Sequence, residues 1–474
     1  MPDPLELRIE HEPALELAFA EAKRFLATLG DGLVREHDAD EVADAIGGAL
    51  PEDGDGALEA LRELAAARGA ATRSPGPRFF HFVTGGVTPA ALAADWLASA
   101  LDQNPGLWTG SPLGSRLESV AIDWLKQLFD LPEEWSGVLT TGATMANFVG
   151  LAAARRWYGE RHGVDVEAEG LAGLPPVPVF GGGYIHASAE KALAMLGVGT
   201  AQIRRLEADD AGRLDLGALE AELERLGGRP AILLATAGEV NAGDFDPIGR
   251  MAELAERFGA WLHVDGAFGL FARASESAAG LAAGVEQADS VIADGHKWLN
   301  VPYECGFAFV REPSYQAGAF AAGAPYLTTE NRPAWGFLGP EMSRRARSFA
   351  TWATLRAYGR SGYAAMVERH LALARRVGEQ VEAAPELELL APVKLNVVCF
   401  RLHPPGFDDE SALDELNRRA GAAVIEDGRV YFGTTIYRGH VCFRPAIVNW
   451  LTTERDVDLI GETLRELAEV STPG

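Results

Sequence analysis

Short apolar runs alternate with helical segments through the middle of the chain, and this alternation constrains the fold more than any other feature. The runs lie at residues 137–140, 177–180, 231–236, 261–265 and 291–293. Most of them are separated by stretches with the apolar spacing of helices. Continuous apolar strands between helices predict an α/β fold with a largely parallel sheet, covered by helices on both faces.

Several of these strands are followed at once by a residue with chemical function. His186 follows the second strand, Asp265 ends the fourth, and Lys297 follows the fifth. Parallel strands bring their carboxyl ends to one edge of a sheet, where open α/β folds bind ligands. A lysine there can act as a Schiff-base nucleophile, because burial favours its neutral amine. Taken singly, a surface lysine, a capping or core histidine and a loop acid are the ordinary alternatives.

A glycine-containing turn opens a long predicted helix that runs to about Tyr158. Gly142, Ala143 and Thr144 form its start, and a helix N-terminus of this kind can bind an anion. Simple N-capping by Thr141 or Thr144 is the alternative. An anion site, a carboxylate, a lysine and an imidazole at one sheet edge together suit pyridoxal phosphate, whose ring acts as an electron sink.

Composition excludes several classes of partner. The chain has 474 residues, a formal net charge of −26 and three cysteines. Such an acidic chain is not expected to bind nucleic acid or anionic membranes, since both need basic surfaces. Three distant cysteines (Cys305, Cys399 and Cys442) predict neither a disulfide framework nor a metal site, and they favour a cytoplasmic location. No signal peptide or membrane span is visible.

A series of short motifs runs through the chain in a specific order. The motif segments are 111–118, 141–147, 186–192, 235–238, 263–267, 294–298, 343–352 and 396–400. In these motifs, and over nearly the whole chain from about residue 75, the sequence resembles the group II pyridoxal-phosphate-dependent amino acid decarboxylases. That family includes the aromatic-L-amino-acid, glutamate and histidine decarboxylases.

This resemblance implies a fold type I, PLP-dependent transferase-like architecture with a mostly parallel seven-stranded sheet. Residues 1–90 are expected to form a helical N-terminal segment that packs on a dimer partner. Residues 91–355 are expected to form the large PLP-binding α/β domain, and residues 356–474 a small C-terminal α+β domain. The resemblance also implies a homodimer with active sites at the interface.

The resemblance also assigns roles to individual residues. Lys297 matches the lysine that binds the cofactor aldehyde, and Asp265 matches the acid that pairs with the pyridine nitrogen. Ala267 and His186 match the residues against the two faces of the ring. The positions that match phosphate-binding residues are Ala143, Thr144 and His296. The expected catalytic residues are Lys297, Asp265, His186 and Tyr326.

Two departures from the family pattern leave the substrate open. Glu239 and Val240 follow Gly238 where aromatic-acid members have two threonines, and Asp294 stands where many members have asparagine. Asp294 places an acid near the proposed phosphate, so it is not assigned as a phosphate ligand. The candidate substrate-pocket residues favour an aromatic or apolar amino acid, although the phenylalanines among them also suit a core: Phe79, Phe80, His81 and Trp108.

The expected activity is α-decarboxylation of an L-amino acid to the amine and carbon dioxide, which makes the chain a carboxy-lyase. A PLP-dependent lyase or aldolase, or an oxygen-dependent aldehyde synthase, is the alternative on the same fold. A non-catalytic scaffold is a third hypothesis, but loss of Lys297 or Asp265 would mark it, and both are present.

Tyr326 falls where the family has the loop tyrosine that protonates the substrate carbon, although a surface-packed loop aromatic is the alternative. Aldehyde-forming relatives commonly carry phenylalanine there. We therefore predict that Tyr326→Phe shifts the product from the amine towards aldehyde, ammonia and peroxide, with oxygen as co-reactant, because phenylalanine cannot donate a proton. Chromatography of both products checks this, and an unchanged amine yield would contradict the assignment.

Overall fold

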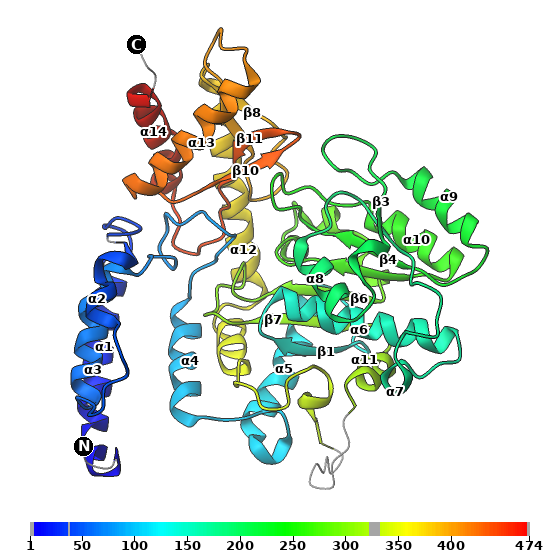
Figure 1. Cartoon of the computed structure of the whole chain (residues 1–474), viewed down its shortest axis with the longest axis horizontal. Coiled ribbons are helices and arrows are strands. Elements are labelled where there is room, and N and C mark those ends of the chain that lie inside the picture. Colours follow the sequence, from blue (N-terminus) through cyan, green and yellow to red (C-terminus); the bar gives the residue numbers. More distant parts are fainter. Residues whose placement is uncertain (1–3, 37, 322–331, 472–474) are drawn as a thin grey trace.

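The computed structural model describes residues 4–36, 38–321 and 332–471. Tyr326, which the resemblance assigns as the proton donor, lies outside these ranges. Figure 1 shows a central sheet with helices around it, a small C-terminal unit, and the N-terminal helices standing to one side. No helix in the described ranges combines the length and the apolarity that a membrane crossing needs.

The central sheet contains seven strands among the described residues, in the order β1-β7-β6-β5-β4-β2-β3. They are β1 (Ser136–Thr140), β2 (Val179–Gly181), β3 (Ile203–Arg205), β4 (Ile232–Thr236), β5 (Trp261–Asp265), β6 (Ser290–Asp294) and β7 (Gly306–Val310). β7 runs antiparallel to its two neighbours, and the pairs among β2 to β6 are parallel. The predicted mostly parallel seven-stranded sheet is therefore confirmed.

The register of the central strands decides where the functional side chains meet. Thr236 at the end of β4 pairs with Asp265 at the end of β5, and Asp265 pairs with Ile292 in β6. Every residue of these three strands is buried. The loop that follows β6 therefore begins beside Asp265, at the carboxyl edge of the sheet.

Helices cover the sheet and carry several motifs. Those of the large domain are α4 (Pro89–Leu101), α5 (Pro112–Leu128), α6 (Ala143–Arg161), α7 (Val166–Glu169), α8 (Ala187–Met195), α9 (Leu216–Leu226), α10 (Ile248–Phe258) and α11 (Pro313–Phe320). Helix α6 lies very close to the sheet, because a Cβ atom on Gly150 would stand 2.8 Å from Cε1 of His263. This close approach brings α6 side chains into contact with β5.

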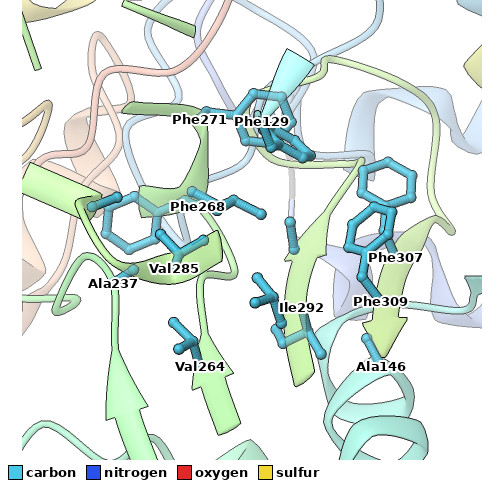
Figure 2. Packing of buried hydrophobic residues seen from close by; sticks show 14 of the residues in the cluster. Phe129, Ala146, Ala237, Val264, Phe268, Phe271, Val285, Ile292, Phe307 and Phe309 are labelled. Carbon is cyan, nitrogen blue, oxygen red and sulfur yellow. The ribbon is translucent and has the colours of Figure 1, made fainter. Parts of the chain in front are cut away.

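The main core packs around strands β5 to β7, helix α5 and the segment 268–274 that follows β5. Figure 2 shows Phe129, Phe271 and Phe309 converging there. The Phe129 ring packs edge-on against Phe271 at a centroid distance of 5.0 Å and against Phe309 at 6.3 Å. Full burial of each such side chain stabilises the fold by roughly 1.5–3 kcal/mol. This packing holds β6 and β7 in place at the back of the site.

Helix α12 (Ser348–Ala383) leads into a small antiparallel sheet in the order β10-β11-β9-β8. Its backbone breaks at Gly359, where φ is 61°. The remaining elements of this unit are β8 (Leu387–Leu389), β9 (Phe400–Leu402), α13 (Glu410–Asp427), β10 (Thr434–Tyr437), β11 (His440–Phe443) and α14 (Glu454–Ser471). Strands with helices between them agree with the α+β unit expected here.

The apolar alternation at 395–401 and 430–433 predicts two strands in this unit. Most of this prediction is wrong, because only the end of the first segment belongs to a strand, β9, and residues 430–433 form no strand. Val430 and Phe432 are buried, which explains the apolar alternation. Their backbone instead pairs with the N-terminal segment, since Phe80 N–H donates to Tyr431 O at 2.8 Å. The local periodicity therefore predicted that these side chains are buried, but it did not predict which segment their backbone pairs with.

The N-terminal helices pack little of their surface against the rest of the chain. They are α1 (His11–Ala27), α2 (Ala43–Ile46) and α3 (Ala57–Ala66). Neither α1 nor α3 has a buried residue. Leu15, Phe19 and Leu64 are exposed apolar side chains on these helices. Figure 1 shows the three helices beside the sheet domain rather than over its core.

Candidate active site

One cavity of about 390 Å³ opens at the carboxyl edge of the sheet. The residues that the resemblance assigned to the cofactor all line it: Lys297, Asp265, His186, Ala267, Ala143, Thr144 and His296. They come from β5, the loop after β6, and the N-terminal ends of α6 and α8. The structure therefore brings these residues together, and their individual roles stay predictions.

The loop that carries Lys297 is held from both sides. Trp298 is fully buried, and its Nε1–H donates to Nδ1 of His370 at 2.8 Å. Nδ2 of Asn300 donates to the carbonyls of Trp298 and Val448, each at 2.9 Å. The lysine side chain thus projects from a fixed backbone, and its Nζ lies 5.9 Å from the centroid of the Phe268 ring.

Both oxygens of Asp265 accept hydrogen bonds inside the fold. Oδ1 accepts from the backbone N–H of Ala267 at 3.1 Å, and Oδ2 accepts from Nδ2 of Asn147 at 2.9 Å. Asn147 lies on α6 and is fully buried. Asn147 had no predicted role of its own, and its polarity within the otherwise apolar stretch 145–154 was the available signal.

A buried hydrogen-bond chain fixes the orientation of the Asn147 amide. Burial lowers the pKa of His263 to about 4, so its ring is neutral near pH 7. Ser290 Oγ accepts from Nε1–H of Trp261 at 3.0 Å and is 2.7 Å from Nδ1 of His263. Nε2–H of His263 then donates to Oδ1 of Asn147 at 2.8 Å. The amide NH₂ is therefore directed at Asp265.

His186 both caps a helix and forms a wall of the cavity. It is the N-cap of α8, and its Nδ1 accepts from the backbone N–H of Ser188 at 3.2 Å. Ser188 Oγ lies 2.7 Å from the same nitrogen and 3.1 Å from Nδ2 of Asn147. Burial lowers the pKa of His186. A neutral ring with its hydrogen on Nε2 follows from these contacts.

The N-terminus of α6 opens into the cavity without a side-chain cap. Gly142 has a φ of 150°, and a Cβ atom there would stand 3.1 Å from Cε1 of His296. The close approach explains the need for glycine. Since Thr141 and Thr144 do not cap the helix, its first N–H groups and its dipole remain available for an anion.

The candidate substrate residues lie elsewhere in this chain. Phe79 and Phe80 are buried, and Phe79 stacks on Tyr431 at a centroid distance of 5.2 Å. His81 Nδ1 accepts from the N–H of Gly433, and Trp108 packs against the guanidinium groups of Arg116 and Arg332. The lining of the cavity does not include these four candidates.

Some residues that line the cavity had not been singled out from the sequence, whereas Glu239 had. Tyr303 and Glu304 line the cavity, and the Tyr303 ring stacks on His296 at 4.2 Å. No local sequence pattern marks these two residues, because it is a turn after the lysine loop that returns the chain to the cavity. Glu239 lies behind the cavity, where its carboxylate accepts the N–H groups of Asn241 and Ala242 at 2.9 and 2.7 Å. Burial raises the pKa of Glu239.

The donor set fits pyridoxal phosphate. An uncapped helix N-terminus suits the phosphate, a carboxylate with fixed oxygens suits the ring nitrogen, and a lysine in a cavity suits the aldehyde. Fold and site together define the class of PLP-dependent α/β enzymes. Residues 60–403 match the family model of the pyridoxal-dependent decarboxylase conserved domain. The chain belongs to the pyridoxal-dependent decarboxylase family.

Individual relatives agree with this family and differ in substrate. The chain is 28% identical to an aromatic-L-amino-acid decarboxylase of Bacillus atrophaeus, covering 91% of this chain and 90% of the relative. It is 33% identical to an L-2,4-diaminobutyrate decarboxylase of Rhizobium meliloti (strain 1021), covering 80% and 76%. The crystal structure of Oryza sativa TDC with PLP and tryptamine superimposes with a TM-score of 0.91, at 25% identity and full coverage of both chains.

These findings establish a PLP-dependent carboxy-lyase that decarboxylates an amino acid. They do not select the amino acid side chain, since the relatives act on different ones.

Asn147→Ala is predicted to lower the free energy of unfolding by about 1–3 kcal/mol, because it leaves buried groups of Asp265 and His263 without partners. Urea denaturation of the cofactor-free protein measures this loss. Lys191→Ala, at an exposed position of α8, is the control and should change stability by less than about 0.5 kcal/mol. Equal stability of both variants would show that water replaces the amide.

Proposed function

We propose that this enzyme decarboxylates an L-amino acid with an aromatic or apolar side chain to the corresponding amine. The observation that carries the proposal is the convergence of Lys297, Asp265 and His186 in one cavity. Phe268, Val240 and Tyr303 in the same cavity support the preference for an aromatic or apolar side chain. Similarity to an aromatic-L-amino-acid decarboxylase supports it further.

Bound PLP supplies an electron sink for the electron pair of the bond between Cα and the carboxylate. In the proposed arrangement, Asp265 pairs with the ring nitrogen and keeps it protonated. Its hydrogen bonds to Asn147 and to the N–H of Ala267 hold its oxygens in position. His186 lies against one ring face as a neutral imidazole, and the small side chain of Ala267 leaves room at the other.

The phosphate is proposed to bind at the N-terminus of α6, with Ala143, Thr144 and His296 beside it. Lys297 would hold the cofactor through its aldehyde, with the side-chain amine as the attachment point. Tyr326 is proposed to donate the proton that Cα needs after carbon dioxide leaves. The Nε2–H of His186 is the proposed helper in this proton transfer.

The decisive experiment incubates the PLP-loaded protein with each common L-amino acid and L-2,4-diaminobutyrate. Carbon dioxide in the headspace and the amine by mass spectrometry are expected mainly from aromatic or apolar substrates. Lys297→Ala should abolish both signals and the long-wavelength absorbance of the bound cofactor.

The other outcomes each reject part of the proposal. Turnover of diaminobutyrate or acidic amino acids alone would overturn the side-chain class. Aldehyde, ammonia and peroxide in place of the amine would favour the oxygen-dependent alternative.

The cytoplasmic location is a prediction from the sequence.

We further propose a homodimer in which the N-terminal helices pack on the partner. Helices α1 and α3 enclose an apolar groove of about 390 Å³ lined by Leu17, Phe25 and Leu61, among others. The groove and the exposed Phe19 and Leu64 provide the kind of apolar surface that soluble proteins usually cover. A second copy of the chain is the expected cover.

Phe19→Asp is therefore predicted to convert a dimer into monomers at micromolar concentration, because it puts a charge into the apolar interface. Sedimentation velocity measures the change from about twice the chain mass of 50.6 kDa. Ile436→Asp is the control, since Ile436 is also an exposed apolar residue but lies on β10 in the small unit. A wild-type monomer would refute the proposal.

A further inference from the structure

We propose that Asp294 is the counter-ion of Lys297 and holds its ammonium group in the cavity whenever the amine is not bound to the cofactor. The inference rests on the function proposed for Lys297 and goes beyond it. Asp294 is the residue at which the chain departs from the asparagine of many family members.

The backbone fixes Asp294 at the end of β6. Its N–H donates to the carbonyl of Ala267 at 2.9 Å, and the residue pairs with Gly306 of β7. Its Oδ2 lies 3.3 Å from Nζ of Lys297 and 3.5 Å from Nε2 of His296. The side chain of Asp294 is 3% exposed. A carboxylate buried to this degree needs an opposite charge close by.

Lys297 is the group that supplies this charge. Burial lowers the pKa of His296 and of His186, so both rings are neutral near pH 7. Burial also raises the pKa of Tyr303, and that of Cys305 to about 12, so neither is ionised there.

The other charged side chains that line the cavity are acidic. They belong to Asp265, which hydrogen-bonds to Asn147, and to Glu304, which forms an ion pair with Arg347. Neither offers a positive charge to Asp294. The ammonium group of Lys297 is therefore the matching partner.

The surroundings of the second carboxylate oxygen of Asp294 argue against a role for Asp294 in binding the phosphate. Oδ1 is buried and has no hydrogen-bond partner among the described residues. It lies 3.5 Å from the position of a Cβ atom on Gly142, beside the N-terminus of α6. A carboxylate oxygen facing a phosphate site repels the phosphate unless the two share a proton. The charged contact that Asp294 does make is that of Oδ2 with Nζ of Lys297.

This ion pair has a chemical consequence. The lysine attaches to an aldehyde through its neutral amine: the nitrogen bonds to the carbonyl carbon, the carbonyl oxygen leaves as water, and the ammonium proton goes to solvent. The Asp294 carboxylate, 3.3 Å from Nζ, pairs with the ammonium group, so attachment has to break this ion pair. Asp294 therefore slows attachment at neutral pH, and it keeps the released lysine inside the cavity during turnover.

The test follows attachment directly rather than activity. Protein freed of cofactor is mixed with pyridoxal phosphate or with phosphate-free pyridoxal over a range of pH. Borohydride then fixes the attached aldehyde as a secondary amine, and peptide mass spectrometry measures modified Lys297. Asp294→Asn is expected to raise the rate at pH 7 by about tenfold to a hundredfold, because it removes the ion pair that attachment has to break.

The comparison of the two aldehydes separates the lysine from the phosphate. If Asp294 acts on Lys297, the Asp294→Asn effect appears with both aldehydes. An effect with pyridoxal phosphate alone would assign Asp294 to the phosphate and overturn the inference. Glu304→Gln is the matched control, because it removes a carboxylate that lines the same cavity but pairs with Arg347. It should change the rate by less than about threefold.

The remaining outcomes are equally decisive. Unchanged attachment in Asp294→Asn with both aldehydes overturns this inference alone. No modification of Lys297 in the wild-type protein at any pH overturns the proposed function as well. If Asp294→Asn does not fold, Asp294→Ser removes the same charge with a smaller side chain, and circular dichroism verifies its fold.

Discussion

The parallel pairing of β5 with β6 is the constraint on which the rest of the site depends. It sets Asp265 level with Ile292, so the loop that follows β6 begins beside the carboxylate. Both strands are buried along their whole length, and a one-residue slip would turn their side chains to the opposite face. The hydrophobic core behind β6 and β7 thereby also determines the chemistry at the sheet edge.

The lysine loop is tied to the small C-terminal unit as well as to the sheet. Trp298 reaches His370 of α12, and Nε2–H of His370 donates to the carbonyl of Asn449 at 2.9 Å. Asn300 adds a second connection to the same segment through Val448 and Trp450. Burial lowers the pKa of His370 to about 3, so this link stays neutral. The position of Lys297 therefore depends on residues far from it in the chain.

Buried polar groups around the cavity are arranged so that few of them carry charge. His263, His186 and His296 all have pKa values lowered by burial. Neutral histidines can orient neighbours through hydrogen bonds without adding repulsion. The charged side chains that line the cavity are Asp265, Asp294, Lys297 and Glu304, and Glu304 pairs with Arg347. The other three match a cofactor that has both a basic ring nitrogen and an electrophilic aldehyde.

The sequence by itself determined the parts that depend on local order. Strand and helix alternation predicted the mostly parallel sheet, because burial on both faces leaves continuous apolar runs. Motif order predicted the residues that line the cavity, since strand ends of a parallel sheet share one edge. Both features depend on residues that are close together in the sequence.

Tertiary structure decided what depends on distant partners. Asn147 reaches Asp265 across 118 positions of sequence, and Tyr303 returns to stack on His296 through a turn with no local signature. Residues 430–433 alternate like a strand but pair with the segment around Phe80 instead. Asp294 is a further case, because the sequence placed it only near the proposed phosphate, whereas the fold sets its Oδ2 3.3 Å from Nζ of Lys297. The periodicity of a sequence predicts that a side chain is buried, but the tertiary structure determines which group it contacts.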